Sequence, residues 1–391
     1  MSQRLCHLNK KDLHLEASFG YLFGDDNSPQ ASLGVHHDMS APLSKYFIFT
    51  CHNSHLTGNQ LSSDCSGVPI INALKRGVRV IELDIWPNSE KDDVDVLHGV
   101  TLTAPVAFIK CLESIKESAF ISSEFPVFIT LEDHLTKDLQ NKAANVSLGA
   151  FQYFLFTPGG EVLKEFPSPE SLKKRVIIST KPPKEYSQIE EVKDKESDLL
   201  SDEARDKLAP QKGNDKHLWL MQGMFRANGH CRYVKKPDFL LNPNEIFDPE
   251  DKHPVKTTLK VTLYIGEGWC HDFDHTHFDP YSPPDFYAKV GVAGVPEDKN
   301  MKKTETVENS WVPFWNQEFE FHITVPELAL LRIEVYENDM EKDDFAGETC
   351  IPIAELKSGI RAVPLMDNKG DMYNNVKLLM QFEFISPPEA T

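Results

Sequence analysis

The sequence lacks a paired-cysteine motif, a long apolar run and an excess of basic charge. Its 7 cysteines are an odd number with no Cys-x-x-Cys pair, which argues against a disulfide framework or a structural zinc site and favours a reducing compartment. No apolar run approaches the roughly 18 residues of a membrane span, and the first residues do not form the apolar stretch of a signal peptide. We therefore expect a protein that is cytosolic or peripheral to a membrane.

The charge balance makes nucleic acid an unexpected partner. The chain of 391 residues carries 60 acidic and 41 basic side chains, a formal net charge of −19 at pH 7. Such a chain repels polyanions, so its approach to a phosphate-rich surface requires local basic residues or a bridging cation. Its length predicts two or three domains.

Short β-rich runs alternate with helical stretches in the first half of the chain. A short helix is predicted at 12–23, strands at 46–50, 78–86, 95–99, 125–132 and 175–180, and helices at 67–76 and 104–119. This alternation is typical of βα units around a parallel sheet.

The second half has a different texture. Residues 182–216 hold ten acidic and seven basic side chains and indicate a solvated linker. Residues 217–225 and 233–241 predict a brief return to β structure, and a Pro- and Asp-rich connector follows at 242–256. From 257 to 385, closely spaced strands with loops rich in Asp, Pro and Gly predict an antiparallel β-sandwich.

Titratable side chains lie at the ends of the predicted strands of the first half: His52, Asn53, Glu82, Asp84, His98 and Glu132. The carboxyl ends of strands in a parallel β/α barrel converge, so these residues are expected in one site. Three carboxylates and an amide oxygen suit calcium or magnesium rather than zinc, and two histidines beside them suit phosphoryl transfer. For any one position a capping or core role is the simpler interpretation, but their joint placement favours a catalytic site.

Five strings of the first half resemble one family: HNSHLTGNQLSSDCS (52–66), ALKRGVRVIELDIWPNS (73–89), VLHGVTLTAP (96–105), FITLEDHLT (128–136) and EFPSPESLKKRVIISTKPPKEY (165–186). They look like the X half of the catalytic barrel of eukaryotic phosphoinositide-specific phospholipase C, closest to the plant form. MQGMFRANG (221–229) and YVKKPDFLL (233–241) look like the end of its Y half. Residues 257–385 resemble the C2 domain that follows, and residues 13–25 resemble the last helix of an EF-hand-like lobe.

The resemblance implies a role for each site residue. His52 and His98 would be the catalytic histidines, and Asn53, Glu82, Asp84 and Glu132 would bind the catalytic calcium. The inositol 2-hydroxyl would attack the 1-phosphate with Glu82 or Glu132 as base, His52 would offset phosphate charge, and His98 would protonate the diacylglycerol oxygen. Lys181 would contact the phosphates of the substrate ring.

The barrel region is short for its type. Residues 40–245 without the linker provide for five or six βα units of about 30 residues, whereas eight units need about 250 residues. The expected fold class is therefore multidomain α/β plus all-β, an incomplete TIM-type barrel followed by a C2 β-sandwich. The expected segments are an N-terminal helical, EF-hand-like segment (1–40), the X half (41–181), a charged linker (182–216), a remnant of the Y half (217–245) and the C2 domain (246–391).

His230 and Arg232 stand where relatives carry glycines. If those positions take positive φ angles, each replacement costs about 1 kcal/mol or more.

Two acidic loops of the predicted sandwich, 271–287 and 336–345, could share calcium ions whose residual charge attracts anionic headgroups. By the family match, Asp279, Asp285, Asp339 and Asp344 are the expected ligands; otherwise such loops only solubilise. Trp269, Phe273 and Phe278 are candidate membrane anchors, although core packing is the commoner fate of such side chains.

Two functions follow. The first is a calcium-dependent phosphodiesterase that cleaves phosphatidylinositol 4,5-bisphosphate to diacylglycerol and inositol 1,4,5-trisphosphate, cytoplasmic and peripheral at the plasma membrane. The alternative is a catalytically weak or inactive variant that binds anionic membranes through its C2 domain, which the shortened Y half favours. A calcium-independent glycerophosphodiesterase-like barrel is disfavoured, because it gives no reason for the sandwich or for the STKPPKEY string.

Overall fold

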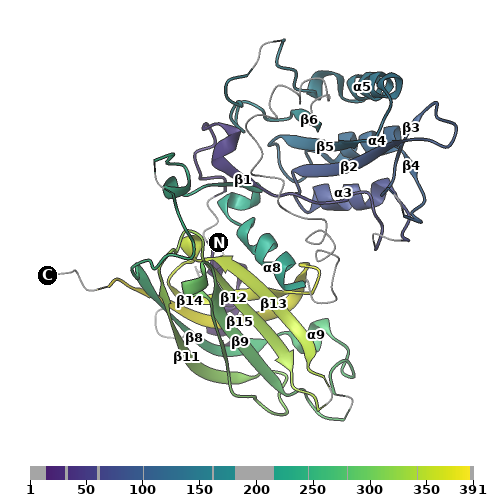
Figure 1. Cartoon of the computed structure of the whole chain (residues 1–391). Coiled ribbons are helices and arrows are strands. Elements are labelled where there is room, and N and C mark those ends of the chain that lie inside the picture. The colour runs from purple at the N-terminus through teal and green to yellow at the C-terminus, as the bar shows by residue number, and fades with distance from the viewer. Residues whose placement is uncertain are drawn as a thin grey trace. The chain divides into compact units, whose positions relative to one another are not determined.

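The computed structural model describes residues 15–30, 34–59, 62–99, 101–160, 163–180, 215–244, 246–279, 281–340 and 342–387. These residues divide into two compact units (Figure 1). The α/β unit takes its described residues from 34–180 and 228–241, and the sandwich unit takes its own from 15–30, 215–227 and 242–387. The units are built from interleaved stretches of chain.

The α/β unit is a sheet with helices packed along it. The strand order is β4-β3-β2-β5-β6, in which β2, β5 and β6 run parallel and β3 runs antiparallel to both its neighbours. The elements are β1 (Tyr46–Ile48), α3 (Gly67–Lys75), β2 (Val80–Pro87), β3 (Val94–Val96), β4 (Val106–Ala107), α4 (Phe108–Ser118), β5 (Val127–Asp133), α5 (Lys137–Phe151) and β6 (Val176–Thr180).

The alternation of apolar and polar residues along β2 explains the two faces of this sheet. Ile81, Leu83 and Ile85 of β2 are buried, and α4 packs between α3 and α5 in the helical layer (Figure 1). Successive side chains of a strand point to opposite faces, so Glu82 and Asp84 share the other face. Helix α3 begins at Ser66, whose hydroxyl oxygen accepts the N–H of Val68 and caps the helix.

Arg79 fixes the entry to β2. Its side chain is fully buried, and the guanidinium donates hydrogen bonds to the carbonyl oxygens of Val78, Ala119 and Ser123, among others. Burial lowers the pKa of Arg79 to about 10, so the group remains charged at neutral pH. The carbonyl dipoles compensate this charge and tie the end of α4 to the start of the strands.

In the described residues the sheet remains open, with β4 and β6 at its edges. Strand β1 pairs antiparallel with β7 (Tyr233–Lys235), and Thr50, two residues after β1, forms a parallel bridge with Val80 at the start of β2. The sequence-based prediction of a βα unit followed by an antiparallel β-sandwich is confirmed.

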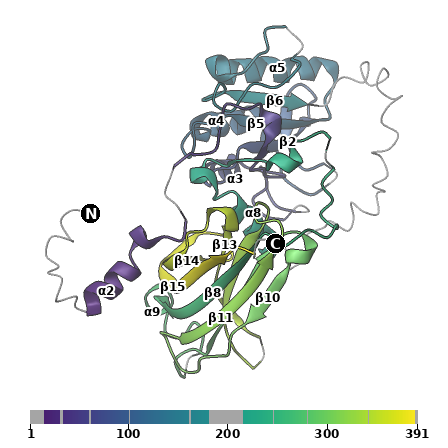
Figure 2. The same cartoon turned by 90° about the vertical axis from the view of Figure 1, so that its left-hand side faces the viewer.

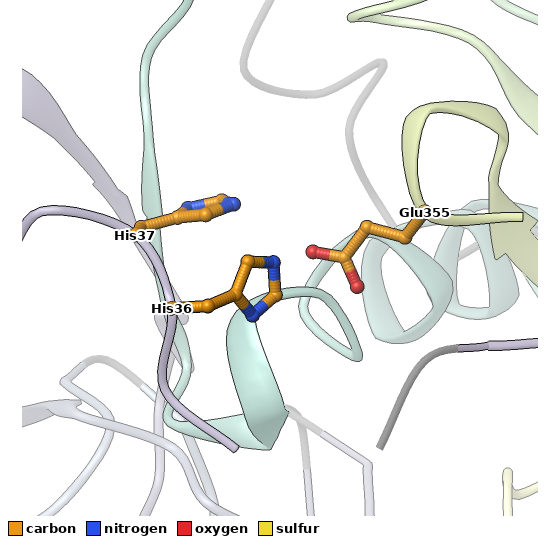
Figure 3. A group of neighbouring side chains, drawn as sticks. All are labelled: His36, His37 and Glu355. Carbon is orange, nitrogen blue, oxygen red and sulfur yellow. The ribbon is translucent and has the colours of Figure 1, made fainter. Parts of the chain in front are cut away.

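The returning segment 228–235 is tied to the α/β unit by hydrogen bonds. The side-chain oxygen of Asn228 accepts the backbone N–H groups of His36 and His37, each at 2.8 Å, and its amide nitrogen donates to Tyr233 O at 2.9 Å. Figure 3 shows the two imidazoles, which meet edge to face with centroids 4.8 Å apart; Glu355, also drawn there, belongs to the other unit.

The sandwich unit consists of two four-stranded layers in the order β10-β9-β12-β13 and β14-β15-β8-β11. A single registered pair, Glu348 with Met366, joins β13 to β14. Alternate apolar side chains of both layers form one core. The elements are β8 (Thr257–Glu267), α9 (Trp269–Asp272), β9 (Phe286–Ala293), β10 (Asn300–Lys303), β11 (Phe314–Ile323), β12 (Leu330–Glu337), β13 (Asp344–Pro352), β14 (Gly359–Met366) and β15 (Met372–Ile385).

Two earlier segments of chain pack on this sandwich. Helix α2 (Leu15–Leu22) precedes Asp25, which pairs with Lys377 at 2.7 Å, and helix α8 (Asp215–Met224) lies against β13 (Figure 2). The predicted β structure at 217–225 is therefore wrong. Trp219 and Gly223, four residues apart, share the helix face that meets the sheet.

The segment 217–245, expected as one remnant, is divided: α8 and the residues to 227 belong to the sandwich unit, whereas 228–241 belong to the α/β unit. In the described part of the chain, none of the helices combines the length and the apolar character of a membrane span.

Candidate active site

Parallel pairing of β2 and β5 places three polar positions on one face of the sheet. Asp84 is the registered neighbour of Glu132, and Glu82 is the registered neighbour of Thr130. Residues two apart on a strand share a face, so the three predicted carboxylates are adjacent at the carboxyl ends of β2 and β5.

His52 and Asn53 reach this face from the end of β1. Nδ1 of His52 lies 2.5 Å from Oε2 of Glu82, and the backbone N–H of Asn53 donates to the same oxygen at 3.3 Å. Asn53 is buried with a positive φ of 48°, a conformation that asparagine tolerates. The tight turn after β1 thus presents both residues to Glu82.

His98 is brought to the site by a β-hairpin that was not predicted from the sequence. The expectation that all the strands bearing site residues run parallel is wrong for β3, which forms an antiparallel hairpin with β2. The chain returns along β2, and the N–H of Leu97 donates to the carbonyl of Asp84 at 3.2 Å. His98 follows at once and is therefore close to the carboxylates.

The proximity of these groups changes how they titrate. Burial, followed by the charges of Glu132 and Glu82, raises the pKa of Asp84 to about 6, while His98 and His134 oppose the shift. Close carboxylates disfavour one another's ionisation, and a cation between them would reverse that effect.

The residue types fit a calcium ion. The donors are carboxylate and amide oxygens, and Asp84 Oδ1 is buried without a hydrogen-bond partner. No three His, Cys, Asp or Glu side chains among the described residues of this unit place ligand atoms within 4.8 Å of one another. The ligand atoms of these side chains are therefore spaced more widely than in a preformed three-residue site.

Sequence reasoning missed two buried supports of the site. His55 is fully buried, burial lowers its pKa to about 4, and it is therefore neutral at physiological pH. The hydroxyl of Ser54 accepts the backbone N–H of Glu82 at 3.4 Å. The sequence offers one signal for these two residues, which is that they follow His52 closely along the chain.

Lys181, the predicted substrate contact, lies outside the described residues. A cavity of about 550 Å³ between α4 and α5 contains none of the predicted site residues and is mostly apolar, so we assign it no role in the chemistry.

The sandwich loops gather three of their four predicted ligands. Burial, and then the charges of Asp339, Asp344 and Asp285, raise the pKa of the buried Glu337 to about 6. Asp279 instead accepts hydrogen bonds from Tyr281 N–H and the Ser282 hydroxyl of its own loop. Glu337 belongs to the acidic loop predicted from the sequence but was not among the four expected ligands, and Asp279 uses both carboxylate oxygens within its own loop.

The predicted membrane anchors are mostly core residues. Trp269 and Phe278 are buried, and Phe273 packs against the core. Tyr281 and Met340, in the two acidic loops, are almost fully exposed.

An open β/α sheet with acidic and imidazole groups at its strand ends, followed by a C2-type sandwich, defines the class of protein. Residues 39–182 match the family described as "Phosphatidylinositol-specific phospholipase C, X domain", and residues 257–366 match "C2 domain". The chain belongs to the phosphoinositide-specific phospholipase C family.

Relatives from Arabidopsis thaliana align along nearly the whole chain. Phosphoinositide phospholipase C 2 is 48% identical over 508 residues, covering 97% of this chain and 87% of that protein, and phosphoinositide phospholipase C 7 is 46% identical, covering 97% and 88%. Because the first alignment spans 508 positions and this chain has 391 residues, more than a hundred positions of the relative have no counterpart here.

The fold also resembles solved structures. The crystal structure of L. pealei PLC21 superposes with a TM-score of 0.78 at 21% identity, over 98% of this chain and 62% of that one. The family and C2 domains are related to calcium generally, and a C2 domain is consistent with peripheral association with membranes.

Proposed function

We propose that the chain is a calcium-dependent phospholipase C that hydrolyses phosphatidylinositol 4,5-bisphosphate to diacylglycerol and inositol 1,4,5-trisphosphate. The observation that carries the proposal is the grouping of His52, Glu82, Asp84, Glu132 and His98 at the ends of β2, β5 and the β2–β3 hairpin. Neighbouring acidic and imidazole groups are what phosphodiester cleavage through a cyclic intermediate requires.

Each residue has a defined task in this proposal. Glu82 or Glu132 accepts the proton of the inositol 2-hydroxyl as its oxygen attacks the 1-phosphate. His52, held by Glu82, offsets the charge that develops on the phosphate oxygens. His98 donates a proton to the glycerol oxygen as the P–O bond breaks, and water then opens the cyclic phosphodiester.

Asn53, Glu82, Asp84 and Glu132 are the residues that would hold calcium. When bound, the ion supplies positive charge beside the attacking hydroxyl and the phosphate. Lys181 is proposed to contact the ring phosphates.

The test is release of water-soluble inositol phosphate from vesicles that contain phosphatidylinositol 4,5-bisphosphate. We expect turnover by the full chain with calcium, and a loss of about 100-fold or more in His52→Ala and His98→Ala. His36→Ala, in the same unit but outside the site, is the matched control. Equal turnover by His52→Ala and the unsubstituted chain would contradict the assignment.

We propose further that the sandwich unit docks this cytoplasmic chain on the anionic inner surface of the plasma membrane. Asp285, Asp339 and Asp344 lie close enough to Glu337 for their charges to raise its pKa, and they would hold calcium there. The exposed Tyr281 and Met340 are placed to enter the headgroup layer. Asp279, with both oxygens engaged in its loop, is the weakest of the four expected ligands.

Vesicle sedimentation tests the docking. Asp339→Asn should weaken calcium-dependent binding to phosphatidylserine vesicles, and Met340→Ala should weaken it by several fold without changing the calcium requirement. Met301→Ala, on the exposed strand β10, is the control. Binding that ignores calcium chelation would refute this mode of docking.

The second candidate is a membrane-binding chain that turns over little or no lipid. It is favoured by the open sheet of the described residues, because a closed barrel normally completes the substrate site. Calcium-dependent vesicle binding without release of inositol phosphate would establish it in place of the first.

A further inference from the structure

The registered pairing of β2 and β5 continues one step beyond the carboxylates. After Asp84 and Glu132, the next positions on the same face are Trp86 and His134. Their rings stack with centroids 3.9 Å apart and an interplanar angle of 14°. The backbone N–H of His134 donates to Ile85 O at 3.1 Å, which holds the end of β5 against β2.

The indole of Trp86 packs directly on the backbone beside His98. A Cβ atom placed on Gly99 would lie 2.3 Å from Cζ2 and 2.9 Å from Cε2 of Trp86, closer than real Cβ atoms approach. Gly99 has an ordinary φ angle, so the absence of a side chain is required there by the contact and not by the backbone. Trp86 therefore sets how close the residue after His98 can come to β2.

Hydrogen bonds hold the backbone of His98 but not the Nδ1 atom of its ring. The position of the ring therefore depends on packing. The hydroxyls of Thr101 and Thr103 donate to the carbonyl of His98 at 2.6 and 3.3 Å. Nδ1 of His98, however, is buried without a hydrogen-bond partner. A catalytic imidazole is usually oriented through the nitrogen that does not react, and here that support is absent.

We propose that the Trp86–His134 stack positions His98 for proton donation to the leaving oxygen. Trp86 and His134 are positioning residues that act through the contact with Gly99. The inference rests on the proposed function in one respect, the assignment of His98 as the acid. The placement of the His98 ring can be tested without turnover.

The first experiment compares two leaving groups with the full chain. Trp86→Ala should reduce kcat on phosphatidylinositol vesicles about 10- to 100-fold, but only a few fold on a 4-nitrophenyl ester of inositol 1-phosphate, because nitrophenolate departs without a proton. His98→Ala should show the same pattern, and the double variant should lose no more than His98→Ala. His52→Ala should be slow on both substrates.

Phe120→Ala is the matched control, because it removes an aromatic side chain that packs against Phe154 at a tilt of 37° elsewhere in the same unit. It should affect both substrates equally. An equal loss on both substrates in Trp86→Ala would mean a structural role alone and would overturn the proposal.

The second experiment is a steric cycle. Gly99→Ala places a methyl group against the benzo ring of Trp86, whereas Trp86→Phe removes the atoms it would strike. We expect Gly99→Ala to lower kcat on the lipid substrate, and the double variant Gly99→Ala/Trp86→Phe to recover several fold. Additive losses would contradict the contact.

Nuclear magnetic resonance of histidine ring carbons separates failure of this inference from failure of the proposed function. The His98 signal, identified by its loss in His98→Ala, should move toward that of an exposed histidine in Trp86→Ala. A shift in a chain that cleaves neither substrate would support the positioning while refuting the activity. An unchanged signal would refute the positioning whatever the activity.

Discussion

His230 and Arg232 carry side chains on backbone positions that favour glycine. Their φ angles are 59° and 70°, between the positive angles of Asn228 and Gly229 and the strand β7. The left-handed conformation costs a side-chain-bearing residue roughly 1–2 kcal/mol. The expectation drawn from the sequence, that such replacements carry a cost if φ is positive, therefore applies at both positions.

Replacing His230, an exposed residue, with glycine should stabilise the chain. We expect His230→Gly to raise the free energy of unfolding by about 1 kcal/mol, because relief of strain exceeds the added entropy of the unfolded chain. His230→Asn should give a smaller gain, since asparagine tolerates this conformation. Urea denaturation measures both, and a loss of stability in His230→Gly would show that its side-chain contacts outweigh the strain.

Glu348 makes the stability of the sandwich unit depend on pH. The residue is fully buried in β13, burial raises its pKa from 4.5 to about 7, and Arg226 opposes the shift. The folded state therefore keeps a proton that the unfolded state releases. The stabilisation that comes from the protonated Glu348 carboxyl is fully present below about pH 4.5 and is lost as pH rises through about 7. The loss in the free energy of unfolding is about 3 kcal/mol at most.

Glu348→Gln should remove this dependence. We expect the free energy of unfolding to fall between pH 5 and pH 8 less steeply in the variant than in the unsubstituted chain, as measured by urea denaturation at each pH. Glu318→Gln, an exposed carboxylate on the same sandwich, should retain the original slope. Parallel slopes in all three proteins would show that Glu348 does not titrate in this range.

At the scale of elements, helix α8 is held on the sandwich by close approach. A Cβ on Gly223 would lie 2.4 Å from Cβ of Cys350 in β13. Trp219 stacks on Phe345 with ring centroids 5.3 Å apart, and its indole N–H donates to Asn368 O. The helix therefore needs a residue without a side chain at this one point of contact.

Gly223→Ala should destabilise the docking of α8 even though alanine favours helices by about 1 kcal/mol over glycine. We expect the amides of residues 217–224 to exchange with deuterium at least ten times faster in the variant. Gly149 lies in α5 with open space around it, so Gly149→Ala should slow the exchange of the α5 amides or leave it unchanged. Equal protection of the α8 amides in Gly223→Ala and in the unsubstituted chain would contradict the close packing.

The elements show what a sequence can and cannot specify. Most strands of both units and the carboxylates of β2 and β5 follow from local periodicity and from the chemistry of strand ends, and these were predicted; the short strands β4 and β10 and the strand β14 were not. The helix at α8, the antiparallel turn that brings His98 to Asp84 and the stack of Trp86 on His134 were not. Each of the three depends on a neighbour distant in sequence, such as Phe345 for Trp219, and no local pattern encodes that neighbour.

At the scale of the whole molecule, each unit takes elements from both sides of residues 181–214. Residues 15–30 lie before that stretch yet belong to the sandwich unit, and β7 lies after it yet pairs with β1 of the α/β unit. Each half of the chain thus contributes a segment to the unit formed mainly by the other half.

A chain cut once between residues 181 and 214 should therefore stay in one piece. We expect a protease site inserted there to yield two bands in a denaturing gel but a single peak at the intact size in gel filtration. The comparison is a chain cut between residues 242 and 256. There the exchange runs one way: the described segments 15–30 and 215–227 lie before the cut but belong to the sandwich unit, and no described segment after the cut belongs to the α/β unit. Separation of the fragments after the first cut would show that the exchanged segments contribute little.

This exchange of segments has a consequence for how a gene of this kind can be recombined. A stretch of the gene that encodes only residues 34–180 would lack β7, and one that encodes only residues 242–387 would lack α2 and α8. Neither unit is therefore encoded by one unbroken stretch, and shuffling of single coding segments would not transfer either unit whole to another gene.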